Sequence, residues 1–138
     1  MIEVTLVLVI VGITGAMSAG RIHQLMIQQL VARAATVLQN DLESAFAIAI
    51  RNRRPIRISW NSSSMQLGVT DRAGSTTYRH SNLGSSAFGL RASNVSVSTT
   101  PVEIYPNGLA NNDLTITLTM ETVTKRIWMS RAGLVIVQ

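Results

Sequence analysis

The chain contains no cysteine, and it has only two tryptophans, two tyrosines and two phenylalanines among 138 residues. Without cysteine there is no disulfide framework and no cysteine-based metal or redox site. So few aromatic rings argue against a surface that stacks nucleic-acid bases. The length is enough for one domain with a modest core. These absences exclude a disulfide-stapled domain and disfavour recognition of bases by stacking.

Motifs of common catalytic and nucleotide-binding sites are also absent. There is no Gly-x-Ser-x-Gly elbow, no phosphate-binding loop and no His-Glu-x-x-His. The two histidines, His23 and His80, stand alone, and a solvated side chain is the ordinary explanation for each. Asn111, Asn112 and Asp113 offer oxygen ligands for calcium but only one carboxylate, and such residues are typical of turns. We therefore predict no enzyme activity, no cofactor and no metal site.

Positive charge is in excess, with twelve lysines and arginines against seven acids. Lys125 is the single lysine, so almost all of this charge is guanidinium. Four arginines stand close together in the sequence: Arg51, Arg53, Arg54 and Arg57. They could hold phosphates through contacts that weaken steeply with salt. Alternatively, arginines at a helix C-terminus favour the helix dipole and keep a sheet edge from pairing.

The first twenty residues, MIEVTLVLVIVGITGAMSAG, form the longest apolar run in the chain. The exceptions between Ile2 and Ala19 are Glu3, Thr5, Thr14 and Ser18. Eighteen helical residues span roughly 27 Å, close to the ~30 Å hydrocarbon core of a bilayer. A helix that is apolar all round is a membrane span or the centre of a helix assembly. We expect residues 1–20 to form a transmembrane or filament-core helix, and residues 21–138 to form a globular domain that includes the second half of the helix.

Glu3 is the one ionisable residue of this run, and it requires a partner. The helix dipole favours a carboxylate in the first turn by ~0.3–2 kcal/mol, which does not offset the several kcal/mol lost on burying an ion. Gly12, Ala16 and Gly20 recur four residues apart, and such a stripe lets another helix approach closely. We predict that Glu3 and these small residues contact neighbouring helices in an assembly. A signal peptide or a plain anchor is the alternative, although the acidic start argues against a signal peptide.

Helical periodicity continues beyond Gly20. Apolar residues recur three and four positions apart on one stripe, namely Ile27, Val31, Ala34, Leu38, Leu42, Ala45 and Ala49. Polar residues, Asp41 among them, lie off this stripe, and no proline occurs before Pro55. The pattern predicts that the helix runs to about Asn52 and that its second half has one covered face.

From Pro55 onward the hydrophobic period changes to two, which is typical of strands. The predicted strands cover residues 56–60, 65–69, 76–80, 95–99, 102–105, 114–120, 126–129 and 134–137, with a polar loop over 81–86. The clearest is Leu114–Met120, where threonine alternates with apolar residues. The predicted fold is therefore α+β, with a long N-terminal α-helix whose second half packs on antiparallel β-sheet.

Two sets of residues resemble a known family. Ile2-Glu3-Val4, followed by an aliphatic block and Gly12, resembles the mature N-terminus of type IV pilins and type II secretion pseudopilins. Relatives usually begin Phe-Thr-Leu-Ile-Glu after a cleaved leader, so we expect that residue 1 lies inside the mature chain or that the start was assigned downstream. The later motifs resemble the GspH/FimT group of minor pseudopilins and minor pilins: Ala47–Asn52, Pro55-Ile56-Arg57-Ile58, Tyr105-Pro106-Asn107-Gly108 and Trp128–Gly133.

The resemblance implies a structural subunit of a type IV pilus-like filament or a type II secretion pseudopilus. Its partners would be other pilin or pseudopilin subunits, and the bacterial inner membrane would hold it before assembly into a periplasmic pseudopilus or an extracellular pilus. In this family Glu3 would pair with the α-amine of a neighbouring subunit.

The alternative is a DNA-binding minor pilin that serves DNA uptake in natural transformation. Some relatives bind DNA through a C-terminal Gly-Arg-x-Arg motif, but here the corresponding residues are Gly133-Leu134-Val135-Ile136. Arg126 and Arg131 lie nearby in the sequence and do not restore the motif. We therefore expect DNA binding to be weak.

Overall fold

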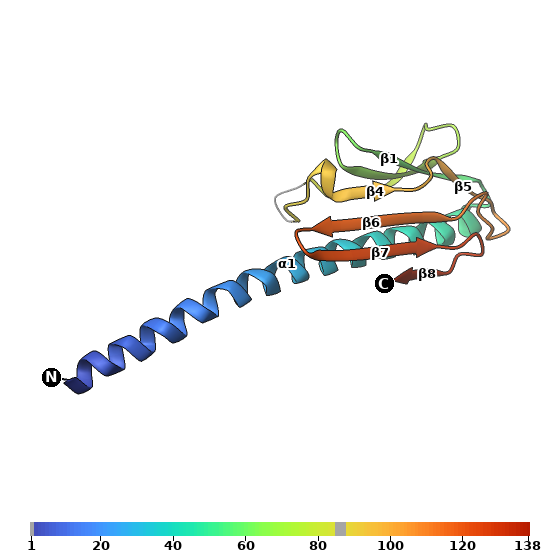
Figure 1. Ribbon diagram of the computed structural model, residues 1–138. Coiled ribbons are helices and arrows are strands. Elements are labelled where there is room, and N and C mark those ends of the chain that lie inside the picture. Colours follow the sequence, from blue (N-terminus) through green and yellow to red (C-terminus); the bar gives the residue numbers. More distant parts are fainter. Residues whose placement is uncertain (1, 85–87) are drawn as a thin grey trace.

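The computed structural model describes residues 2–84 and 88–138, and the side chains within these ranges except those of 14–20 and 92. The described chain contains α1 (Ile2–Asn52), β1 (Ile56–Asn61), β2 (Gln66–Asp71), β3 (Thr77–Asn82), η1 (Ala92–Asn94), β4 (Val95–Val97), β5 (Val102–Ile104), β6 (Leu114–Met120), β7 (Val123–Met129) and β8 (Val135–Val137). The first half of α1 extends away from the strands, and its second half lies along them (Figure 1). The predicted α+β fold is confirmed.

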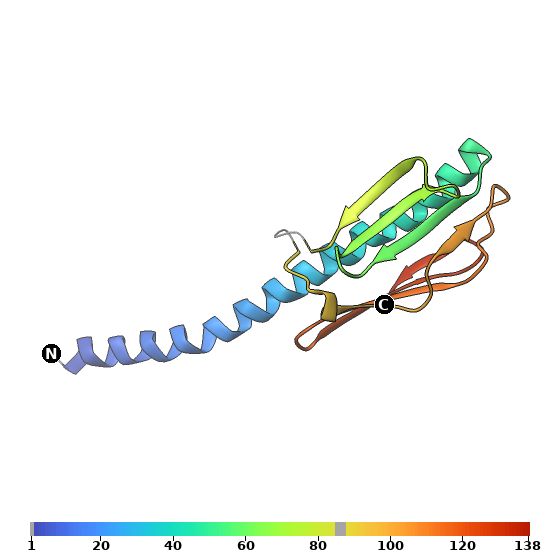
Figure 2. The same cartoon turned by 90° about the horizontal axis from the view of Figure 1, so that it is seen from above.

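The helix α1 is continuous over 51 residues and passes through Gly20 without a break. All seven residues of the predicted apolar stripe are buried. The helix ends at Asn52, and Arg53 follows in the left-handed conformation, with φ of 52°. This geometry is a common helix end, and Pro55 then keeps the chain from continuing as a helix. Seen from above, the second half of α1 lies against the strands that follow it, early ones such as β1 and late ones such as β7 (Figure 2).

The described strands form two antiparallel sheets of four strands each, with the orders β3-β2-β1-β5 and β4-β6-β7-β8. In the first sheet, the β1–β2 hairpin pairs Ile56 with Asp71, and β5 adds to the other side of β1. In the second sheet, β6 and β7 pair along their whole length, from Leu114 opposite Met129. Apolar side chains alternate inward on β1, β2 and β6, as their period predicts: Ile56, Ile58, Leu67, Val69, Leu114, Ile116 and Leu118 are all buried.

Asp41 lies off the predicted apolar stripe of α1, but its side chain does not face solvent. Its side chain is 1% exposed, and it accepts a hydrogen bond from Ser81 and forms an ion pair with Arg79. Both partners lie on β3, which extends to Asn82 and therefore includes the first two residues of the predicted polar loop. The Ser81 hydrogen bond to Oδ2 and the ion pair of Oδ1 with Arg79 offset the cost of burying this carboxylate, while Oδ1 itself accepts no hydrogen bond from a described residue.

The strand β7 also differs from its prediction, since it begins at Val123 rather than at Arg126. Val123 is the one apolar side chain among its first four residues, and Thr124, Lys125 and Arg126 are polar, so this part of the strand carries little alternating signal. The tight turn before it places Glu121 in the left-handed conformation, with φ of 52°. Pairing with β6 then continues out to Met120 opposite Val123, which makes the hairpin longer than the hydrophobic pattern alone predicts.

Candidate functional site: the exposed half of the helix and the arginines at its other end

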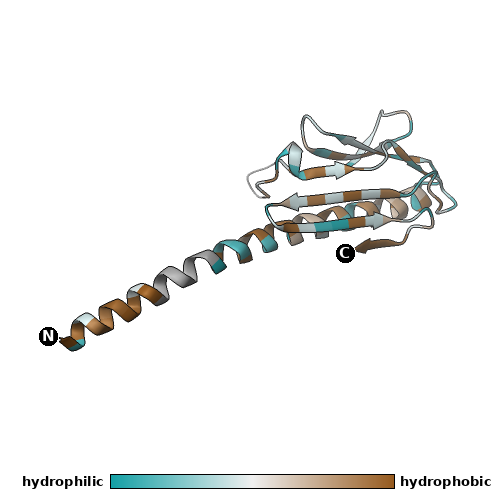
Figure 3. Ribbon diagram, in the orientation of Figure 1, coloured by the Kyte–Doolittle hydropathy of each residue, from teal (hydrophilic) through white to brown (hydrophobic). Residues whose placement is uncertain are grey.

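The first half of α1 exposes an unusual amount of apolar surface. Its large aliphatic side chains are 52–83% exposed: Ile2, Val4, Leu6, Val7, Leu8, Val9, Ile10, Val11 and Ile13. Hydropathy colouring shows the apolar character along this end of the helix (Figure 3). Exposed apolar patches of this extent mark interaction with another protein or with a membrane. This surface is the main candidate site of the molecule.

The predicted assembly residues lie on this half of the helix. Glu3 is exposed in the first turn of α1. Gly12 is also exposed, and a Cβ atom added to it would have no neighbour within 4 Å, so another helix has room to approach there. Ala16 and Gly20 lie on the same continuous helix, but their side-chain surroundings are outside the described residues. Their role in assembly remains a prediction.

Within the part of the chain that the structure describes, no helical stretch is both long enough and apolar enough to cross a membrane. The predicted span of residues 1–20 includes positions 14–20, whose side chains are not described. The transmembrane assignment therefore stays a prediction.

At the opposite end of α1, the predicted arginine cluster divides into two parts. Arg51, Arg53 and Arg54 are exposed, and none of the three forms an ion pair with a described residue. Arg57 differs, because it lies directly opposite Glu103 across β1 and β5. Its Nη2 atom is 3.0 Å from Oε1 of that carboxylate. Arg57 therefore already has an anionic partner within the fold.

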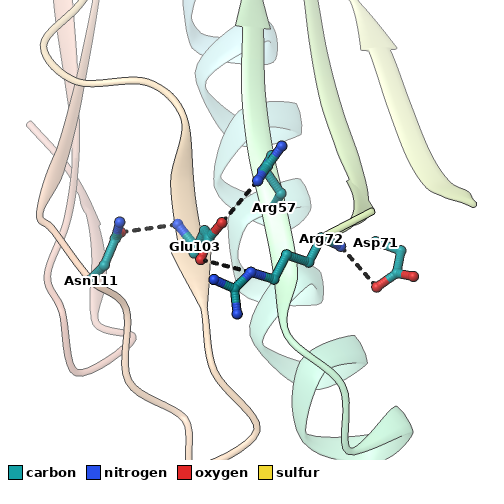
Figure 4. Close-up of polar contacts among 5 residues, drawn as sticks. All are labelled: Arg57, Asp71, Arg72, Glu103 and Asn111. Carbon is teal, nitrogen blue, oxygen red and sulfur yellow. Dashed lines mark hydrogen bonds and ion pairs between the residues drawn. The ribbon is translucent and has the colours of Figure 1, made fainter. Parts of the chain in front are cut away.

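Glu103 also contacts a second arginine, which the sequence analysis did not include in the cluster (Figure 4). The Nε atom of Arg72 lies 3.6 Å from Oε2 of Glu103, whose side chain is 14% exposed. The backbone N–H of Arg72 donates to the carbonyl of Pro55, which places this residue beside the end of α1. The position of Arg72 near the cluster could have been predicted from the sequence, because a β1–β2 hairpin with its turn near residues 61–64 brings residue 72 back beside residue 55.

The two C-terminal arginines, Arg126 and Arg131, lie outside this cluster, and no contact among the described residues joins them to it. Arg126 is exposed on β7, and its backbone pairs with Gln138. Arg131 donates from its backbone N–H to Asp113 at 2.8 Å and from Nε to the carbonyl of Ala110 at 3.3 Å. Arg131 thus ties the β7–β8 turn to the segment before β6, and part of its guanidinium is engaged in the fold.

The described residues contain no group of three histidines or acids arranged to hold a metal ion. His23 contacts Glu121 at 3.3 Å, with both side chains exposed. This contact joins α1 to the tip of the β6–β7 hairpin. Exposed pairs of this kind contribute little to stability.

No family model matches this sequence, and no curated protein sequence matches it. Solved structures do share its fold. Two crystal forms of the type IV minor pilin FimU of Pseudomonas aeruginosa match with TM-scores of 0.60 and 0.58 at 16% identity. These matches cover 78% of this chain and 87% and 91% of the FimU chains. The minor pseudopilin EpsH of the type 2 secretion system of Vibrio cholerae matches with a TM-score of 0.54 at 10% identity, over 78% of this chain and 94% of that one.

At these identities the likeness establishes the fold, which is the pilin-like fold of a long N-terminal helix on antiparallel sheets. The fold that the resemblance to pilins and pseudopilins implies is therefore confirmed, whereas the assignment to the GspH/FimT group stays a prediction. By their descriptions, the similar structures are a type IV minor pilin and a minor pseudopilin.

Proposed function

We propose that this chain is a non-enzymatic structural subunit of a type IV pilus-like filament or a type II secretion pseudopilus, and that it is a minor subunit of the GspH/FimT type. The observation that carries the proposal is the contrast between the two halves of α1. From Ile27 to Ala49 the apolar stripe is buried by the chain's own strands, whereas from Ile2 to Ile13 the large apolar side chains are exposed. Apolar surface left uncovered by the chain itself needs a lipid or protein partner.

The shape of the chain suits storage in a membrane followed by assembly. We propose that residues 1–20 lie in the bacterial inner membrane and that residues 21–138 form the globular domain outside the cytoplasm. On extraction, the same helices would gather at the centre of a periplasmic pseudopilus or an extracellular pilus, with other pilin or pseudopilin subunits as neighbours. Gly12 supports this step, because its open surroundings allow close helix contact.

Glu3 supplies the specificity of this assembly in the proposal. An exposed carboxylate in the first turn would be costly in an apolar assembly without a positive partner. The α-amine of a neighbouring subunit would provide that partner and would fix the axial position of one helix against the next. A membrane anchor alone would need no such residue.

The experiment compares Glu3→Ala with Glu43→Ala in a host that assembles the filament. Glu43 is an exposed acid on the second half of α1 that accepts a hydrogen bond from Gln39, so it is a matched control. We expect both variants in the membrane fraction, but only the Glu43 variant in sheared filaments. Normal incorporation of Glu3→Ala would contradict the proposed role of Glu3, and absence of the unmodified chain from filaments would contradict the function itself.

A second candidate function is DNA capture by a minor pilin during natural transformation. The exposure of Arg51, Arg53 and Arg54 favours it, because free guanidinium groups bind phosphates. The terminal hairpin disfavours it, since the residues after Gly133 are apolar and Arg131 is partly engaged with the backbone. We rank this candidate second.

A further inference from the structure

We infer that the end of the domain farthest from residue 2 carries a binding surface for an acidic partner protein. We call it the distal surface. It combines five arginines, Arg51, Arg53, Arg54, Arg57 and Arg72, with three exposed or half-exposed apolar side chains, Ile50, Tyr105 and Leu109. The last turn of α1 and the connection that follows β5 both lie at this end of the molecule (Figures 1 and 2).

The fold itself brings these residues together from three segments. The end of α1 supplies Ile50 and the first three arginines, and the β1–β2 hairpin returns Arg72 to a hydrogen bond with the Pro55 carbonyl at 3.3 Å. The segment 105–109 folds over the helix end, where Tyr105 N–H donates to the carbonyl of Leu109 at 2.8 Å. A Cβ atom added to Gly108 would lie 3.6 Å from Cδ1 of Ile50, so this turn and the helix end are in contact.

The charge of the distal surface is not balanced within the chain. Glu103 already pairs with Arg57 and Arg72, and Asp71 accepts the backbone N–H of Arg72 at 2.8 Å. No described carboxylate forms an ion pair with the three arginines at the helix end. Complementarity therefore requires an acidic partner.

The apolar residues decide which kind of acidic partner fits. Ile50 is 54% exposed, Leu109 49% and Tyr105 37%. A phosphate backbone gains nothing from covering isoleucine or leucine, whereas protein interfaces combine an apolar centre with arginine and tyrosine. We therefore favour a protein over a nucleic acid.

Two other occupants fit less well. The helical rise places Arg51 about 47 Å along α1 from residue 20, so headgroups of the membrane around the first half of the helix are out of reach. The placement of the first half of α1 in a membrane rests on the proposed function. A second copy of this chain also fits poorly, because it carries twelve basic residues against seven acids, and two of those acids, Asp41 and Glu103, are already ion-paired within the fold.

The test uses the full chain in non-ionic detergent and fluorescence anisotropy with two labelled peptides. Each peptide carries eight glutamates around a central pair, which is Leu-Leu in one and Gly-Gly in the other. We expect the Leu-Leu peptide to bind at least threefold more tightly, and Arg53→Gln with Arg54→Gln to weaken both by about tenfold. Leu109→Ser should remove the preference for Leu-Leu alone, while the control pair Arg21→Gln and Arg33→Gln, exposed elsewhere on α1, should change neither.

Several outcomes would overturn the inference. Equal affinity for the two peptides would reduce the distal surface to non-specific charge, and tighter binding of a twenty-base-pair duplex would assign it to nucleic acid. Absence of peptide binding would leave the arginines as a solvated helix end. Because peptide binding is measured without filament assembly, its failure is distinct from failure of the proposed function.

Discussion

Arg79 on the edge strand β3 forms an ion pair with Asp41 of α1, and the two side chains differ sharply in exposure, at 50% for the arginine and 1% for the carboxylate. Ser81, two residues along the same strand, donates to the other carboxylate oxygen. The side chains of β3 are otherwise mostly solvated. Polar contacts with one buried acid therefore join this edge of the first sheet to the helix.

Truncating Arg79 should destabilise the chain more than its exposed position suggests. Arg79→Ala leaves a buried carboxylate with only Ser81, and we expect a loss of about 3 kcal/mol or more. Asp41→Ala leaves an arginine that water can solvate, so we expect a smaller loss of about 1–2 kcal/mol. Urea unfolding of the full chain in detergent measures both. Arg91 is exposed and forms no ion pair with a described residue, so the control Arg91→Ala should change the free energy of unfolding by no more than about 0.5 kcal/mol. A larger loss for Asp41→Ala than for Arg79→Ala would refute this account.

Replacing Arg53 by glycine should stabilise the chain. The left-handed conformation costs a non-glycine residue roughly 1–2 kcal/mol, and glycine removes most of that strain. Arg54→Gly is the matched control, because Arg54 is not among the residues with positive φ and should gain nothing. Thermal unfolding of both variants gives the comparison. A lower midpoint for Arg53→Gly would mean that the arginine side chain stabilises the helix end by more than its backbone costs.

A fragment of residues 24–138 should fold without the exposed half of the helix. The buried stripe begins at Ile27, so the fragment keeps the helical surface that covers the strands. We expect a soluble protein with a mixed helix and sheet circular dichroism spectrum and a single cooperative unfolding transition. A predominantly helical spectrum, or aggregation of the fragment, would show that the first half of α1 contributes to the folded domain.

Duplex DNA should bind only weakly, with a dissociation constant of ~10⁻⁴–10⁻⁶ M at physiological salt. Arg53→Gln with Arg54→Gln should then flatten the dependence on salt by about 1.8 logarithmic slope units, since two phosphate contacts are lost. Electrophoretic titration over a range of salt concentrations measures both values. Sub-micromolar binding that depends on these two arginines would make DNA capture the main function.

The helix and most strands could be predicted because their signals are local. The period of three and four from Ile27 to Ala49 marks the buried face of α1, and alternation from Leu114 to Met120 marks β6. Asp41 could not be placed, because its partners lie on a strand some forty residues later. Its position three residues after Leu38 does put it at the edge of the buried stripe.

The division into two sheets had no local signal either. The short strand β4 joins the second sheet, while β5, the next strand in the chain, returns to the first sheet beside β1. This crossing creates the pair between Arg57 and Glu103, so the arginine cluster could be seen in sequence but its internal neutralisation could not. The exposed apolar half of α1, with Glu3 and Gly12, could be predicted from the sequence, because a run of apolar residues is a local feature of the chain.

The packing of α1 against β7 and β8 has a consequence for how the chain folds. These strands come last in the sequence, and they contact the helix that comes first. The part of the apolar stripe of α1 that packs on β7 and β8 therefore stays uncovered during synthesis until almost the last residue has emerged. Contacts between such distant segments slow folding, because a long loop must close before they form. During that interval the same helix offers two apolar surfaces, one of which the finished domain covers, so the nascent chain is most prone to aggregation just before its final hairpin forms.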